Sequence, residues 1–184
     1  EKEENDWTVA STILHDERDR LFVLEVRRFQ GGTFEIARIF VEQVLRWGTL
    51  PNTGFAVGVE NGQLWMALEP TVRQALEEAG QYPPIEPLKP LTDKLARARP
   101  LQGRMQAGKV WWPNEAQWLG QARRELLRFP GGEHDDIVDS LSWAVRLAME
   151  YPPPRTNTQQ QQASWKDRLN KAFRSGDRGS HMAS

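Results

Sequence analysis

Three aspartates stand together at the start of a hydrophobic helical pattern. Asp135, Asp136 and Asp139, hereafter the aspartate cluster, follow a Pro-Gly-Gly turn and precede a mostly apolar stretch. Adjacent aspartates repel one another, and Asp is a poor helix former away from the first turn. A divalent cation would absorb this charge, because hard cations bind carboxylate oxygens. The simpler alternative is a solvated acidic helix start, which the helix dipole stabilises by about 0.3–1 kcal/mol per charge.

Glu60 is the second candidate for metal chemistry. It ends the apolar segment 55–59, which predicts a short buried strand, and an Asn-Gly turn follows it. Ligands in open α/β sheets bind beyond the carboxyl ends of strands, so we expect Glu60 to converge with the aspartate cluster. Several carboxylates could hold two metal ions about 3.5–4 Å apart, which activate a water and stabilise the leaving oxygen of a phosphodiester. The alternative for Glu60 alone is a carboxylate of the turn.

Two neighbours of these carboxylates are secondary candidates. Asp6 precedes the first predicted strand, and it either points toward the same site or caps a local turn. His134 adjoins the aspartate cluster, and it is either a proton carrier or outer ligand, or a helix-capping or structural residue. The sequence contains no cysteine, and carboxylates without thiolates favour Mg²⁺ or Mn²⁺ over Zn²⁺.

A basic segment precedes the aspartate cluster in the chain. It comprises Lys94, Arg97, Arg99, Arg104 and Lys109. Lys94 and Arg97 are three residues apart and share one face of a helix. We expect these side chains to hold phosphates, which positions DNA without reading its sequence. The alternative is a solvated helix face.

Length and composition restrict the classes of protein that the chain can belong to. The 184 residues suffice for one domain with a sizeable core. A net charge of −1 creates no overall field for nucleic acid, so a DNA partner must be held by a local basic surface. No apolar run is long enough to span a membrane, and no signal-peptide pattern is present.

The elements that position these residues follow from periodicity and from turn residues. Segments 7–14 and 21–29 are rich in β-formers and predict a hairpin. Strands alternating with helices then predict an α/β fold with a mixed sheet. The further expected helices are 33–47 with Thr33 as N-cap, 63–79 bent or broken near Pro70, 92–106 interrupted at Pro100, 114–127 and 135–149, and the further expected strands are 55–60, 85–88 and 108–112.

A proline triplet is expected to end the folded unit, which gives three parts. Residues 1–154 are the predicted domain, and residues 155–178 are a predicted flexible tail with a short amphipathic helix over 165–173. Residues 179–184 resemble an expression-vector scar, so His181 within them is not a functional candidate.

Four segments of the chain resemble the C-terminal nuclease domain of the large terminase subunit of tailed bacteriophages. They are residues 6–8 (DWT), 57–61 (VGVEN), 93–110 and 129–141, and they occur in the family's order. The resemblance implies an RNase H-like mixed β-sheet of the resolvase type, flanked by helices on both faces. It also implies metal-dependent cutting of double-stranded, concatemeric DNA when the viral genome is packaged into a procapsid.

The resemblance also implies roles for particular residues. Glu60, Asp135 and Asp136 would be catalytic metal ligands, with Asp139 beside them. The implied cofactor is Mg²⁺ or Mn²⁺, bound as a pair of ions. In the family, a first catalytic aspartate lies on a central strand upstream of the element that contains Asp6. We expect the aspartate cluster to need that carboxylate to complete the metal site.

The implied partners are double-stranded DNA, the portal protein and the small terminase subunit. The ATPase domain of the family is expected in the full-length protein, because these residues contain no Gly-rich phosphate loop. The implied location is the host cell cytoplasm, at the procapsid portal, with no membrane partner.

Two other functions stay open at the level of the sequence. The first is another RNase H-like nuclease, such as a junction resolvase or a transposase, which would prefer branched DNA over linear duplex. The second is a non-catalytic module that docks on DNA or on the portal ring through its basic face and tail. Normal DNA binding without metal-dependent cleavage would favour this module.

Overall fold

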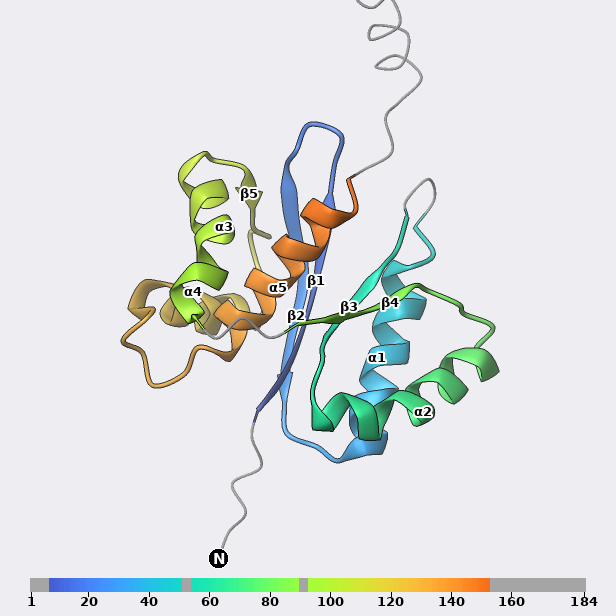
Figure 1. The fold of residues 1–184 in the computed structure, drawn as a ribbon. Helices are drawn as coiled ribbons and strands as arrows, with labels where there is room; N and C mark the ends of the chain where they lie inside the picture. The colour runs from blue at the N-terminus through green and yellow to red at the C-terminus, as the bar shows by residue number, and fades with distance from the viewer. Residues whose placement is uncertain (1–6, 51–53, 90–92, 153–184) are drawn as a thin grey trace, which may run out of the picture. The chain divides into compact units, whose positions relative to one another are not determined.

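A computed structural model of the protein describes residues 7–50, 54–89 and 93–152, all within the unit Glu1–Pro153 (Figure 1). The predictions for Asp6, for the tail and for the terminal scar lie outside the described residues. No helix in the described ranges combines the length and the apolar character that crossing a membrane requires.

The described part has an α/β fold with mixed strand pairing, as predicted. β1 and β2 pair antiparallel, whereas β2 with β5 and β3 with β4 pair parallel. The elements in chain order are β1 (Thr8–His15), β2 (Leu21–Phe29), α1 (Thr33–Trp47), β3 (Val57–Glu60), α2 (Gln63–Glu78), β4 (Ile85–Leu88), α3 (Lys94–Gln106), β5 (Val110–Trp111), α4 (Leu119–Arg128) and α5 (Asp136–Glu150).

A β-bulge sets which side chains of the hairpin reach the core. The register leaves Leu24 unpaired between Val23 and Glu25 of β2. A bulge shifts the alternation of side chains by one residue. As a result, Leu21, Val23 and Val26 all lie in the same buried cluster, although strict alternation would place Val26 on the opposite face.

Helices cover both faces of the β1–β2 hairpin, as the RNase H-like expectation requires. Neighbouring residues of a strand point to opposite faces, and β1 shows where each face leads. Ser11 hydrogen bonds with Ser140 of α5 (Oγ to Oγ, 2.8 Å), whereas Thr12 donates to Gln43 of α1 (Oγ1 to Oε1, 3.4 Å). α5 therefore packs on one face and α1 on the other (Figure 1).

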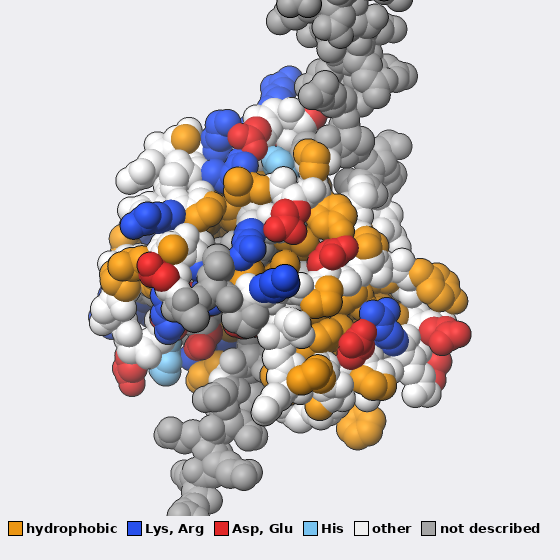
Figure 2. Space-filling view, viewed as in Figure 1, with side chains coloured by type: hydrophobic (Ala, Val, Ile, Leu, Met, Phe, Trp, Pro, Cys, Tyr) orange, Lys and Arg blue, Asp and Glu red, His pale blue; other side chains and the backbone are white. Residues whose placement is uncertain are grey.

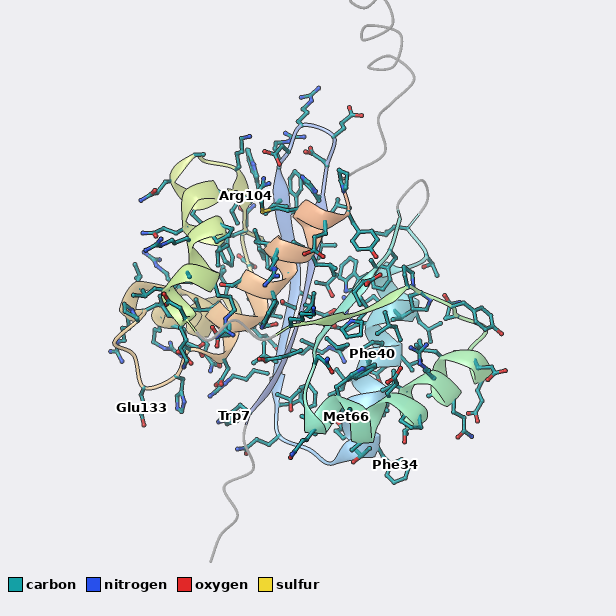
Figure 3. All side chains as sticks on the ribbon, in the orientation of Figure 1. Trp7, Phe34, Phe40, Met66, Arg104 and Glu133 are labelled. Atoms are coloured by element: carbon teal, nitrogen blue, oxygen red, sulfur yellow. The ribbon has the colours of Figure 1, made fainter. Side chains whose placement is uncertain are left out.

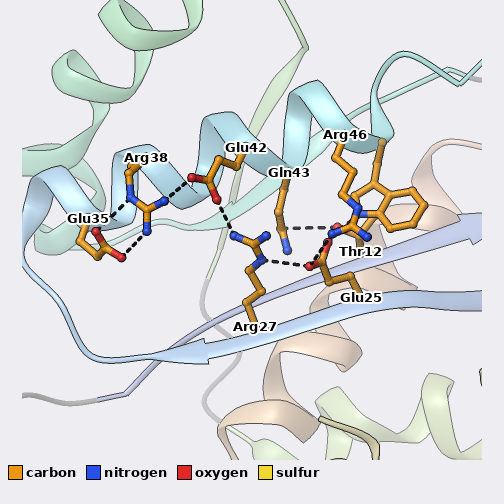
Figure 4. Close-up of polar contacts among 9 residues, drawn as sticks. Thr12, Glu25, Arg27, Glu35, Arg38, Glu42, Gln43 and Arg46 are labelled. Atoms are coloured by element: carbon orange, nitrogen blue, oxygen red, sulfur yellow. Dashed lines mark hydrogen bonds and ion pairs between the residues drawn. The ribbon is translucent and has the colours of Figure 1, made fainter. Parts of the chain in front are cut away.

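The contact between β2 and α1 is largely ionic (Figure 4). Arg27 donates to Glu25 on its own strand at 2.9 Å and to Glu42 of α1 at 2.7 Å, and Glu42 also pairs with Arg38. Glu25 accepts a further bond from the Trp47 indole at 2.8 Å. Burial raises the pKa of Glu25, but the bonds from Trp47 and Arg27 outweigh it, so the pKa is lowered overall. The pairing thus keeps this half-buried carboxylate charged.

The second pair of strands, β3 and β4, packs on α1 and α2 and also reaches α5. These elements enclose a second hydrophobic cluster, whose buried side chains include Trp65, Val72 and Leu76 of α2. A Cβ on Gly58 of β3 would lie 3.2 Å from Leu147 of α5 and even closer to a β4 side chain. Glycine therefore allows β3 to approach α5, and α5 contacts both β1 and β3.

Three local predictions were wrong, namely the interruption of α3 at Pro100, the N-cap role of Thr33 and the start of α4. α2 and α3 run without interruption through Pro70 and Pro100, respectively. Burial on both sides of each proline offsets the lost backbone bond, as Leu101 beside Pro100 illustrates at 2 % exposure. Thr33 is the first residue of α1 rather than its cap, because Gly32 occupies the N-cap position without a side-chain bond. α4 also begins later than predicted, at Leu119.

Candidate functional site

The start of α5 combines a buried helix body with acidic side chains at one end. Ile137 and Leu141 are fully buried, and α5 begins at Asp136 with Asp135 in the N-cap position. The side chain of Asp135 makes no capping bond, although its backbone carbonyl accepts the Asp139 N–H at 2.9 Å. The aspartate cluster therefore occupies the first turn of α5, as the sequence pattern predicts.

Glu125 of α4 caps α5 in place of Asp135. Its Oε2 accepts the backbone N–H of Ile137 at 2.9 Å, and Gln121 donates to its other oxygen at 3.3 Å. Sequence reasoning missed this residue, which is only 6 % exposed. The sequence gives one indication of its role: Glu125 follows Ala122 by three residues, so both lie on the same, buried face of α4.

Two residues of α3 pair with the aspartate cluster. Lys94 Nζ lies 2.6 Å from Asp135 Oδ2, and Arg97 Nη2 lies 2.8 Å from Asp139 Oδ2. The side chain of Lys94 is 56 % exposed, whereas that of Arg97 is 7 % exposed. The lysine can therefore leave its partner at small cost, but the arginine is fixed within the fold.

A third cation approaches the cluster from β2. Arg28 Nη2 lies 3.4 Å from Asp136 Oδ2, and the Arg28 guanidinium carbon lies 3.9 Å from the centre of the Trp7 ring. A guanidinium over an indole face is stabilised by the ring quadrupole. Each member of the aspartate cluster thus has a basic partner, and sequence reasoning did not identify Arg28.

Asp139 carries the clearest electrostatic signature of the site. Burial raises the pKa of Asp139, and the charge of Asp135 adds to this effect, whereas Arg97 opposes it; the pKa is raised overall. Asp139 Oδ1 is buried and has no hydrogen-bond partner among the described residues. A carboxylate oxygen without a hydrogen-bond partner is the type of ligand that hard cations such as Mg²⁺ or Mn²⁺ bind.

The predicted convergence of Glu60 with the aspartate cluster stays a prediction. Glu60 is the exposed last residue of β3, and the N–H of Asn61 extends the bonding to β4 through Leu88 at 2.9 Å. Within the described ranges, no three His, Asp or Glu side chains lie close enough together to hold a metal ion. His134 is exposed directly before the cluster.

The basic segment divides into exposed and internally paired side chains. Lys109 Nζ donates to Asp19 at 2.6 Å, and Arg104 reaches from α3 to the same carboxylate in the β1–β2 turn (Figure 3). These two bonds, from Lys109 and then Arg104, hold the pKa of Asp19 far below its usual range. Asp19 adopts a positive φ of 61°, which Asp tolerates better than most residues.

Arg97, Arg104 and Lys109 therefore have partners within the fold, and the near-complete burial of Arg97 does not suit the predicted contact with DNA phosphates. Arg99 and Lys94 are exposed on α3. On the face drawn in Figure 2, basic side chains gather mainly on the half that carries α3, α4 and α5, with acidic side chains among them.

An α/β fold with helices on both faces and carboxylates at the start of α5 is the arrangement expected of an RNase H-like nuclease domain. The sequence model of the terminase RNase H-like domain matches residues 1–147. The chain belongs to this family, and the predicted fold and family are thereby confirmed. No curated protein matches the chain significantly.

Proposed function

We propose that the protein is the endonuclease domain of a viral DNA-packaging terminase and cuts double-stranded, concatemeric DNA by metal-dependent hydrolysis. The observation that carries the proposal is the aspartate cluster on the first turn of a buried helix, in a chain of the terminase RNase H-like family. Burial of the helix body fixes the positions of the carboxylates, which catalytic ligands require.

The residues proposed to hold the metal ions are Asp135, Asp136 and Glu60, with Asp139 beside them. The unsatisfied Oδ1 of Asp139 and the all-oxygen donor set support Mg²⁺ or Mn²⁺. When bound, a pair of such ions supplies an activated water and stabilises charge on the leaving oxygen of the phosphodiester. The metal ions, their number and the cleavage reaction are parts of the proposal.

The basic residues around the cluster have two proposed tasks. Arg97 fixes the orientation of Asp139, because a buried guanidinium bound to a carboxylate restricts both groups. Lys94 balances the charge of Asp135, and its exposure leaves it able to reach a DNA phosphate together with Arg99. Such contacts hold the DNA backbone, so little sequence preference is expected.

A further carboxylate on a central strand belongs to the proposal. Among the described residues, β1 is paired on one edge by β2, and β3 is paired on one edge by β4. α5 packs against both β1 and β3, which supports a position between them for the central strand of the family. An aspartate on such a strand would face the start of α5 and complete the metal site.

The proposed partners follow from packaging by a terminase. They are double-stranded DNA as substrate, the portal protein and the small terminase subunit as docking partners, and an ATPase domain in the full-length protein. Membership of the terminase RNase H-like family supports a role in phage DNA packaging.

Cleavage of supercoiled plasmid in Mn²⁺ tests the proposal. We expect nicked and linear products that EDTA abolishes, and at least about 100-fold slower cleavage by Asp135→Ala or Glu60→Ala, because metal affinity is lost. Glu133→Gln changes an exposed carboxylate in the preceding turn and should cleave normally. Intact plasmid, together with unchanged Mn²⁺ affinity in both alanine variants, would contradict the proposal. Faster cleavage of branched DNA than of linear duplex would instead favour a junction resolvase.

A further inference from the structure

We propose that Glu125 is a positioning residue of the candidate active site, because it caps α5 from α4 and so releases the Asp135 side chain from capping. The inference rests on the proposed function, in which Asp135 is a metal ligand. In this role Glu125, a buried carboxylate outside the aspartate cluster, keeps the oxygens of Asp135 available for a metal ion.

The first turn of a helix has backbone N–H groups without partners inside the helix. An aspartate in the N-cap position ordinarily accepts one or two of these N–H groups with its own side chain. Asp93 of this chain does so at the start of α3, where its Oδ1 accepts from Leu95 at 2.9 Å and from Ala96 at 3.2 Å. A capping aspartate of this kind has one oxygen committed to its own helix.

Asp135 holds the same N-cap position in α5 but behaves differently. Its side chain makes no capping bond, and the N–H of Ile137 is taken by Glu125 Oε2 at 2.9 Å. Asp135 Oδ2 is directed instead to Lys94 Nζ, at 2.6 Å. The two N-cap residues also differ in backbone conformation, with φ −91° and ψ 106° at Asp93 but φ −137° and ψ 11° at Asp135. An aspartate at the N-cap therefore does not by itself decide which side chain caps the helix, and at α5 the capping acceptor is Glu125.

The surroundings of Glu125 suit this task. A carboxylate that is 6 % exposed is costly unless its oxygens accept hydrogen bonds, and Glu125 accepts from Ile137 and from Gln121. Its negative charge also lies at the positive end of the α5 dipole. If Glu125 is removed, we expect the N-cap residue Asp135 to turn toward its own helix as the alternative acceptor and to lose its orientation as a ligand.

The experiment measures Mn²⁺ affinity by isothermal titration calorimetry in the variants Glu125→Ala, Glu125→Gln and Val72→Ala. Val72→Ala is the control for lost stability, because it removes fully buried methyl groups from the cluster around α2 without touching the acidic helix. Far-ultraviolet circular dichroism identifies a temperature at which all the variants are folded.

We expect Glu125→Ala to weaken Mn²⁺ binding about tenfold or more, as loss of a supporting residue behind a metal ligand typically does. Glu125→Gln keeps an acceptor oxygen and should retain most of the affinity, and Val72→Ala should bind as the wild type does. Wild-type affinity in Glu125→Ala, or an equal loss in Val72→Ala, would overturn the inference alone. A wild-type protein that binds no Mn²⁺ would overturn the proposed function together with it.

Discussion

The ion pair between Arg97 and Asp139 gives the most quantitative prediction, through the substitution Arg97→Met. Methionine keeps an apolar stem near Trp143, whose ring centre lies 5.5 Å from the guanidinium carbon, but it removes the charge. Loss of one partner of a buried pair costs about 3–5 kcal/mol. The side chain of Asp139 is 24 % exposed, so water can partly solvate the remaining carboxylate. We therefore expect a loss at the lower end, about 3 kcal/mol at neutral pH.

The loss of stability should depend on pH in a defined direction. Burial raises the pKa of Asp139 and Arg97 opposes this effect, so removal of Arg97 raises the pKa further. A carboxyl group with a raised pKa in the folded state favours folding at low pH, and this contribution is lost as the pH rises through that pKa. The difference between wild type and Arg97→Met should therefore be small in acid and should grow toward neutral pH.

Urea denaturation followed by tryptophan fluorescence at several pH values measures this difference. Arg99→Met is the matched control on the exposed side of α3 and should change the unfolding free energy by no more than about 0.5 kcal/mol. In an Asp139→Asn background, Arg97→Met should cost much less, because the two residues are coupled. A loss under about 1 kcal/mol at neutral pH, or an equal loss in the Asp139→Asn background, would show that the Arg97–Asp139 pair does not stabilise the fold as proposed.

Two further predictions concern the basic segment. Lys94→Ala should tighten Mn²⁺ binding by up to about fivefold, because the exposed Lys94–Asp135 ion pair, worth about 0.2–1 kcal/mol, no longer competes with the metal for Asp135. The same substitution should lower the salt dependence of DNA binding by about one phosphate contact. Calorimetry and DNA titrations in KCl measure both effects, and weaker Mn²⁺ binding would contradict the first. Asp19→Asn keeps a residue that tolerates the positive φ but removes the charge that Lys109 and Arg104 bind, so it should lower stability by about 1 kcal/mol at neutral pH. The pKa of Asp19 is lowered in the fold, so this difference in stability should shrink as the pH falls below the ordinary pKa of an aspartate. A difference that is constant with pH would show that the ion pairs of Asp19 with Lys109 and Arg104 do not stabilise the fold.

Sequence periodicity predicted the helices and strands that depend mainly on local residue patterns. The hairpin strands, the short strand Ile85–Leu88 and the acidic helix α5 lie where turn residues and apolar spacing placed them. The predicted interruption at Pro100 was wrong, because packing on other elements, not local propensity, keeps α3 continuous.

The supporting residues of the site were less predictable than its carboxylates. Three aspartates within five positions stand out in the sequence, but the task of Glu125 depends on how α4 packs against α5. Likewise, spacing placed Lys94 and Arg97 on one helix face, but only the packing of α3 on α5 buries Arg97 against Asp139 and leaves Lys94 exposed. Such contacts join residues about forty positions apart, and their partners cannot be chosen from local patterns.

Anomalous diffraction from crystals soaked in Mn²⁺ is the decisive test of the proposed metal site, since it locates the metal without relying on activity. We expect Mn²⁺ to be bound by the carboxylates of Asp135 and Asp136 at the start of α5, with Lys94 displaced from Asp135. An absence of Mn²⁺ from this helix start at saturating concentration, with the Lys94–Asp135 pair intact, would contradict the proposed metal site.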